Sequence, residues 1–248
     1  MRSRSSRFLV SLRRRLWLPL PLLPLRCPGA SCRKIIDTEG DHLAACPHTG
    51  LLKRRARPLE RAWAQVFREA GARVADDQKL RDMAIPGILP SDRREIEIVA
   101  YDLPLFHGSP LCCDATIVSA IRADGHPAWS RHHPPGKALL APESRKRSTY
   151  RDVEAGRFAR LLVLGCELGG RWSKDASSIL FALADARAEQ APALLRGQVK
   201  AALVYRWSAL IAVTVQDTVA ATLTGAGCGS LQFAATSMPT WGDLDRPP

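Results

Sequence analysis

Leu111-Cys112-Cys113-Asp114-Ala115-Thr116-Ile117-Val118 is the stretch on which the interpretation of the fold depends, because it is an almost continuous apolar run that contains one acid. Such a run predicts a buried strand. Upstream, residues 95–100 alternate polar and apolar side chains, which predicts a half-buried strand. An unpaired charge inside a buried strand is costly, so Asp114 is expected to have a partner or a metal ion.

Elements on either side of these two strands predict a mixed α/β fold. Residues 161–166 form a second continuous apolar run between loops, which predicts a central strand. Apolar positions at helical spacing predict a helix from Leu59, with Pro58 in its first turn and Gly71 at its end. Further helices are predicted over residues 146–159, 173–190 and 192–223. Strands with helices on both sides imply a mixed α/β layer fold.

The remaining segments are predicted to be short or irregular. Residues 72–74 suggest a short strand, and the polar residues 76–92, which contain Pro86, Gly87 and Pro90, predict a loop. Residues 122–142 are rich in Pro, His and Gly and are expected to form an excursion from the core. Residues 225–248 are expected to form a flexible tail.

Two acids and a lysine follow one another along the predicted core. Glu97 lies in the first strand, Asp114 in the next, and Lys146 at the start of the predicted helix that follows. Glu97 and Asp114 would face a common site if the two strands pair. Carboxylates that hold Mg2+ beside a basic group are what metal-dependent phosphodiester cleavage needs. The alternative is that Glu95, Glu97 and Lys146 are solvated charges.

Three cysteines and one histidine near the start predict a metal site. The spacing is Cys27-x4-Cys32-x9-His42-x3-Cys46, and zinc favours such tetrahedral sets of thiolates and imidazole. A loop of this length has little apolar material to bury, so a metal would supply its stability. His48 is a competing ligand, and free thiols are the alternative. The seven cysteines, odd in number and irregularly spaced, argue against a secreted disulfide framework.

The net charge of +12 is concentrated at the beginning of the chain. Residues 1–60 contain 13 Lys/Arg against 4 Asp/Glu. A basic end on a near-neutral body suits a polyanionic partner, although a solvated basic tail without a partner explains the charge equally well.

The first 25 residues combine arginines with an apolar run, Leu16–Leu25, that three prolines interrupt. The run is too short to span a bilayer. It resembles a targeting presequence, but the prolines and the lack of a clean cleavage site favour a linker remnant. We therefore expect a nuclear or cytoplasmic protein, with a presequence as the alternative.

These residues together resemble the C-terminal part of site-specific non-LTR retrotransposon proteins, in which a Cys-Cys-His-Cys knuckle precedes a restriction-endonuclease-like domain of the PD-(D/E)XK superfamily. Each matching piece is short, and the specific part is their order over roughly residues 20–220. The matching stretches are Cys27…Cys32, Gly40-Asp41-His42-Leu43-Ala44-Ala45-Cys46, Arg93-Arg94-Glu95-Ile96-Glu97-Ile98-Val99, Leu111-Cys112-Cys113-Asp114-Ala115-Thr116 and Arg145-Lys146-Arg147-Ser148-Thr149-Tyr150.

The resemblance implies an endonuclease that nicks target DNA for an upstream reverse transcriptase, which this chain lacks. It implies structural zinc in the knuckle, catalytic Mg2+ held by Glu97 and Asp114, and a Lys146 that orients water or stabilises charge. Tyr150 would contact phosphate or pack beneath the site. Glu60 is an accessory candidate, and Asp92 an alternative first acid. The expected partner is DNA, with RNA as a further candidate, and no membrane.

The resemblance also implies a division of the chain and leaves its activity open. The predicted parts are a basic, proline-rich linker over 1–26, a knuckle over 27–50, an endonuclease core over 55–190, C-terminal helices over 191–224 and a tail over 225–248. The competing hypothesis is a catalytically inactive, nucleic-acid-binding remnant of such an element. A third is a targeted protein with a real presequence.

Overall fold

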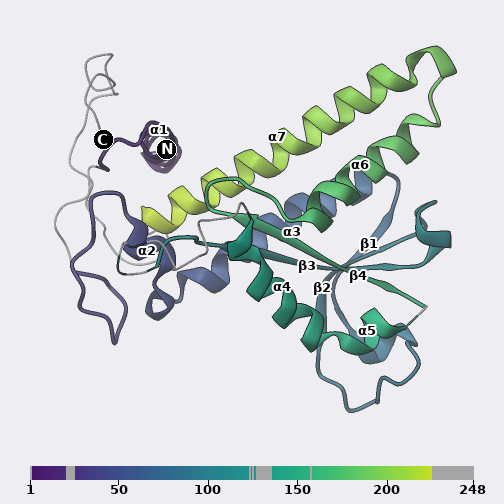
Figure 1. The fold of residues 1–248 in the computed structure, drawn as a ribbon, viewed down its shortest axis with the longest axis horizontal. Coiled ribbons are helices and arrows are strands. Elements are labelled where there is room, and N and C mark those ends of the chain that lie inside the picture. The colour runs from purple at the N-terminus through teal and green to yellow at the C-terminus, as the bar shows by residue number, and fades with distance from the viewer. Residues whose placement is uncertain are drawn as a thin grey trace.

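The computed structural model contains a four-stranded mixed sheet, and it describes residues 2–20, 26–122, 124, 126, 136–156 and 158–224. The strands lie side by side in chain order (Figure 1). Their bounds are β1 Arg73–Lys79, β2 Glu95–Tyr101, β3 Leu111–Val118 and β4 Arg160–Glu167. β1 and β3 each pair antiparallel with β2, whereas β3 and β4 are parallel. The mixed α/β fold expected from the sequence is therefore present.

The strands predicted over residues 95–100, 111–118 and 161–166 are confirmed, but β1 was predicted too short. It runs on to Lys79 and is followed by a 3-10 turn, η2 Leu80–Met83, inside the segment expected to be a loop. β1 is an edge strand that pairs only with β2 and is largely exposed. Its polar residues therefore lack the apolar alternation by which a half-buried strand is recognised.

Helices cover both faces of the sheet (Figure 1). On one face, α3 Leu51–Glu69 and α6 Lys174–Ala188 pack on the sheet, and α7 Arg196–Leu223 packs on these two helices. Large buried side chains such as Trp63 and Trp207 belong to the same core as strand residues such as Ile98. On the other face lie α4 Lys137–Thr149 and the short α5 Arg151–Ala155. Tyr150, between these two helices, and Val153 of α5 pack against β2, β3 and β4. The short helices η3 Phe106–Gly108 and η4 Ala193–Leu195 lie in connections.

Two helices begin earlier than predicted, and each continues through a proline. α3 begins at Leu51, after Gly50 at φ +68°, so Pro58 lies inside it and not in its first turn. α4 begins at Lys137 and contains Pro142, so residues 137–142 of the expected excursion are helical. An interior proline removes one backbone hydrogen bond. Both helices nevertheless continue beyond the proline, and both pack on the sheet. Most of the rest of the excursion lies outside the described residues.

The close approach of α4 to the sheet depends on Gly165 of β4. A Cβ atom at this position would lie 2.9 Å from Leu139 Cδ2 of α4. A larger residue would force the buried Leu139 side chain to shift within a close-packed core.

An N-terminal helix, α1 Arg2–Arg15, packs against α7, although this segment lies in the predicted linker. Val10 is fully buried, Ser11 Oγ donates to Gln216 O at 3.3 Å, and Arg7 pairs with Asp217 at 3.1 Å. α1 ends before Pro19, as the prolines predict. Residues 21–25 and the expected tail over 225–248 lie outside the described residues. Among the helices that the structure describes, none is long and apolar enough to cross a membrane.

Candidate functional site

The four predicted zinc ligands come together in one small cluster. The ligand atoms of Cys27, Cys32, His42 and Cys46 all lie within 4.8 Å of one another. Cys27 Sγ is 3.7 Å from Cys46 Sγ, and Cys32 Sγ is 3.4 Å from His42 Nε2. Tetrahedral zinc bonds of about 2.3 Å to sulfur and about 2.0 Å to nitrogen put two ligand atoms about 3.5–3.8 Å apart. The cluster therefore fits a zinc ion in both ligand type and spacing.

The backbone around the cluster is shaped by short-range contacts. Asp37 caps the helix that carries His42, α2 Asp41–Ala45, by accepting from the backbone N–H groups of Asp41 and His42, both at 2.7 Å. Gly29 N donates to Cys27 Sγ at 3.5 Å, and a Cβ atom at Gly29 would lie 2.8 Å from His48 Cβ. These contacts shape the loop, and apolar residues such as Ile36 and Leu43 join it to the main core of the protein.

The competing ligand, His48, does not join the cluster. It lies in the 3-10 turn η1 Pro47–Thr49, and its Nδ1 is 2.7 Å from Ser31 Oγ at the exposed edge of the loop. Within the described part of the chain, the one group of three or more His, Cys, Asp or Glu side chains close enough to share an ion is the Cys27, Cys32, His42, Cys46 set.

Glu97, Asp114 and Lys146 meet on the face of the sheet that α4 covers. Lys146 Nζ is 2.6 Å from Asp114 Oδ2 and 3.8 Å from Glu97 Oε1. Asp114 is fully buried, whereas the side chains of Glu97 and Lys146 are 24% and 33% exposed. The group is therefore open to solvent at Glu97 and Lys146, with Asp114 at its buried end. Lys146 lies in the last turn of α4 and not at its start, which corrects the predicted position.

Backbone pairing between β2 and β3 stops beside this group. The paired positions run from Ala100↔Leu111 to Ile98↔Cys113, so Glu97 and Asp114 occupy the next register position. There the Glu97 carboxylate accepts from the Ala115 backbone N–H, with Oε2 2.6 Å from the nitrogen. The Glu97 side chain thus accepts the hydrogen bond that a partner strand would otherwise accept from Ala115. This bond fixes the Glu97 carboxylate at the point where β2 and β3 separate.

The buried Asp114 carboxylate disfavours ionisation of the neighbouring Glu97. Burial, and then the neighbouring Asp114 carboxylate, raise the pKa of Glu97 to about 8, although the Ala115 N–H and Lys146 act in the opposite direction. Burial also raises the pKa of Asp114, against the effect of Lys146. Asp114 Oδ1 has no hydrogen-bond partner among the described residues. Two crowded carboxylates and one unpartnered buried oxygen are a set that a divalent cation would stabilise.

The other predicted site residues take different places. Tyr150 is buried and its hydroxyl donates to Glu95 O at 2.7 Å, so it packs beneath the group. Glu60 is buried and pairs with Arg57 at 3.2 Å, and its charge contributes to raising the pKa of Glu97. Asp92 is held by Arg94 in a 2.6 Å ion pair and does not join the group.

A buried arginine that was not predicted from the sequence connects the sheet to the loop over residues 27–46, which carries the four candidate zinc ligands and is called the zinc loop below. Arg55 of α3 donates to Ala44 O in α2 at 2.6 Å and to Ile117 O in β3 at 3.5 Å. Burial lowers the pKa of Arg55 to about 10. In the sequence, Arg55 is one of three consecutive basic residues, and nothing in their composition marks it as the buried one.

No protein-family model matches the chain, and no curated protein matches it either.

Proposed function

We propose that this chain is a metal-dependent DNA endonuclease with a zinc-stabilised loop beside its catalytic core. The observation that carries the proposal is the convergence of Glu97, Asp114 and Lys146 at the point where β2 and β3 part. A mixed sheet flanked by helices is also the architecture that the resemblance to restriction-like endonucleases implies. The family membership, the retrotransposon origin and the DNA substrate are all part of the proposal.

The chemistry follows from the properties of the three side chains. Glu97 and Asp114 would hold Mg2+, which is commonly bound in proteins by one or two carboxylates together with water and phosphate oxygens. A bound Mg2+ would supply an activated water and stabilise the leaving oxygen. Lys146, whose ammonium is partly exposed, is placed to stabilise the charge that develops on a phosphate at the edge of the group. Tyr150 positions the strand beneath by its bond to Glu95 O.

Electrostatics favour a nucleic acid as substrate. The 14 residues of α1 contain six arginines and no acid. A basic helix on a near-neutral body attracts a polyanion and makes its binding depend on salt through counterion release.

The test is nicking of supercoiled plasmid by the zinc-loaded chain in Mg2+. Glu97→Ala and Asp114→Ala are each expected to reduce nicking about 100-fold or more. Glu95→Ala is the matched control because Glu95 is exposed, lies two residues from Glu97 on the same strand and keeps its backbone carbonyl for Tyr150. Nicking that survives Asp114→Ala or EDTA contradicts the assignment.

Absence of nicking with persistent, salt-dependent DNA binding would favour the second hypothesis, a non-catalytic nucleic-acid-binding module. The basic helix α1 is the observation that supports this alternative. Binding that does not weaken with salt would contradict both hypotheses.

A further inference from the structure

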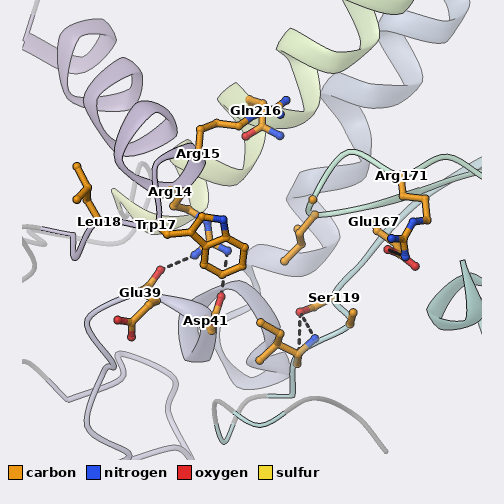
Figure 2. Close-up of a pocket in the computed structure, with 14 residues that line it drawn as sticks. Arg14, Arg15, Trp17, Leu18, Glu39, Asp41, Ser119, Glu167, Arg171 and Gln216 are labelled. Atoms are coloured by element: carbon orange, nitrogen blue, oxygen red, sulfur yellow. Dashed lines mark hydrogen bonds and ion pairs between the residues drawn. The ribbon is translucent and has the colours of Figure 1, made fainter. Parts of the chain in front are cut away.

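A cavity of about 320 Å³ lies away from the carboxylate pair, where the zinc loop meets the end of α1 (Figure 2). Its other walls come from the segments that follow β3 and β4, at the carboxyl ends of these parallel strands, and from Gln216 of α7. Crevices at the carboxyl ends of parallel strands are common ligand sites. A volume near the lower end of the range for small-molecule pockets suits one ligand ring system.

The cavity has an exposed aromatic wall. Trp17, just beyond α1, is 82% exposed, and Figure 2 shows its indole at the centre of the view, projecting from α1 toward the zinc loop. Its backbone φ of +54° is one that residues other than glycine rarely adopt. Ile121 and Leu168 add apolar surface to the cavity. An exposed indole with apolar side chains nearby is the type of surface on which an unstacked base binds.

The charged groups of the cavity complete such a site. Arg14 is already bonded to Asp41 at 3.0 Å, and Arg171 pairs with Glu167 at 3.2 Å. Arg15 lines the cavity and has no ion pair or hydrogen bond among the described residues, so its guanidinium is available for a phosphate. The Glu167 side chain is 8% exposed, and its Oε1 has no hydrogen-bond partner in the described part of the chain.

We propose that this cavity binds one unstacked base of single-stranded DNA, with the base on Trp17, its phosphate at Arg15 and an amino group of the base at Glu167. A carboxylate accepts from the exocyclic amino group of cytosine, adenine or guanine, which thymine lacks. The choice of DNA rests on the proposed function, whereas the recognition of a base does not. The cavity would hold a displaced single strand beside the duplex that the core acts on.

The experiment measures binding of a fluorescently labelled cytidine oligodeoxynucleotide to the zinc-loaded full chain in Mg2+-free buffer. Trp17→Ala is expected to weaken binding about tenfold or more, because stacking on an aromatic side chain is a large part of single-strand affinity. Tyr205→Ala is the matched control, since Tyr205 is an aromatic residue that is 79% exposed on α7 and does not line the cavity. Bound oligonucleotide should also reduce the quenching of wild-type tryptophan fluorescence by acrylamide. This protection should be lost in Trp17→Ala, which lacks the exposed indole.

Base preference tests the role of Glu167. The wild type is expected to bind the cytidine oligonucleotide about fivefold more tightly than its thymidine counterpart, and Glu167→Gln should remove that difference. Zinc content and the thermal transition of each variant report whether it folds. Equal affinity of Trp17→Ala and wild type would overturn the base site, and equal binding of both oligonucleotides by the wild type would overturn the assignment of Glu167. Tighter binding of the matching RNA would overturn the choice of DNA.

Plasmid nicking is read separately from oligonucleotide binding. A wild-type chain that binds the oligonucleotide through Trp17 but never nicks plasmid rejects the endonuclease and keeps the base site. A chain that nicks through Asp114 but shows no effect of Trp17→Ala rejects the base site and keeps the endonuclease.

Discussion

The zinc loop and the carboxylate pair differ in where their parts come from. The zinc loop takes all four ligands from residues 27–46, and its shape is set by neighbours such as Asp37 and Gly29. The carboxylate pair and Lys146 come from β2, β3 and α4, which meet only when the sheet and its covering helix are assembled. The first site depends on local chemistry and the second on tertiary packing, so the two should respond differently to perturbation.

Removal of a zinc ligand is expected to have the largest effect. Cys46→Ala should reduce bound zinc from about one ion per chain to near zero, because structural zinc contributes on the order of 10 kcal/mol to the folding of small metal-bound loops. The loop around residues 26–50 should then become sensitive to protease. Zinc content by elemental analysis and limited proteolysis measure this.

Two control variants test whether the loss of zinc is specific to the four ligands. Cys166→Ala removes a buried thiol of β4 outside the cluster and should leave zinc content unchanged. His48→Ala should also retain the ion, because His48 lies outside the ligand set. Zinc loss in His48→Ala would show that the ligand assignment is wrong.

Breaking the connection between the two regions is expected to have an intermediate effect. Arg55→Met removes the donors to Ala44 O and Ile117 O, and should lower the free energy of unfolding by about 2 kcal/mol. Arg54→Met changes an exposed neighbour on the same helix and should alter stability by less than about 0.5 kcal/mol. Urea denaturation compares the two. Equal effects of both variants would mean that Arg55 does not connect the loop to the sheet.

A pH titration isolates the carboxylate pair and is expected to give an effect on stability no larger than that of Arg55→Met. The folded-state pKa of Glu97 is raised from its ordinary value of 4.5 to about 8, so the folded chain binds this proton more tightly than the unfolded chain does. Stability from this group is therefore fully present below about pH 4.5 and is lost as pH rises toward about 8, by about 2 kcal/mol after allowance for partial exposure.

Glu97→Gln should flatten that slope, and Glu95→Gln should not, as measured by urea denaturation across the same pH range. Mg2+ should also flatten the slope in the wild type, because a cation beside the pair stabilises the ionised carboxylates. A slope that Glu97→Gln leaves unchanged would assign the pH dependence to another group.

The sequence predicted all four members of the cluster that could hold a metal ion, but it predicted the arrangement of the carboxylate site only in part. Ligand type and spacing within a short loop were enough for Cys27 and its partners. Glu97 and Asp114 could be placed together once the two strands were taken as neighbours. Lys146 was assigned to the wrong end of its helix, because Pro142 and the glycine-bounded start at Lys137 concealed the first turns of α4.

Residues whose role depends on distant packing could not be predicted. Arg55 becomes buried only because of the face of α3 on which it lies, and the polar side chains of β1 reflect the exposure of that strand at the edge of the described sheet. Asp37 was missed for a related reason, because it reaches the first N–H groups of α2 from outside the N-cap position, which Gly40 occupies.

The packing of α1 on α7 has a consequence for how the chain folds as it is synthesised. Val10 is buried and Arg7 is paired with Asp217, so α1 acquires its docking surface on α7 only after about 200 further residues have been synthesised. The sheet from β1 to β3 needs only close neighbours in sequence and can form earlier. Until α7 is made, Val10 of α1 stays uncovered, and transiently exposed apolar surface of this kind favours aggregation or capture by chaperones.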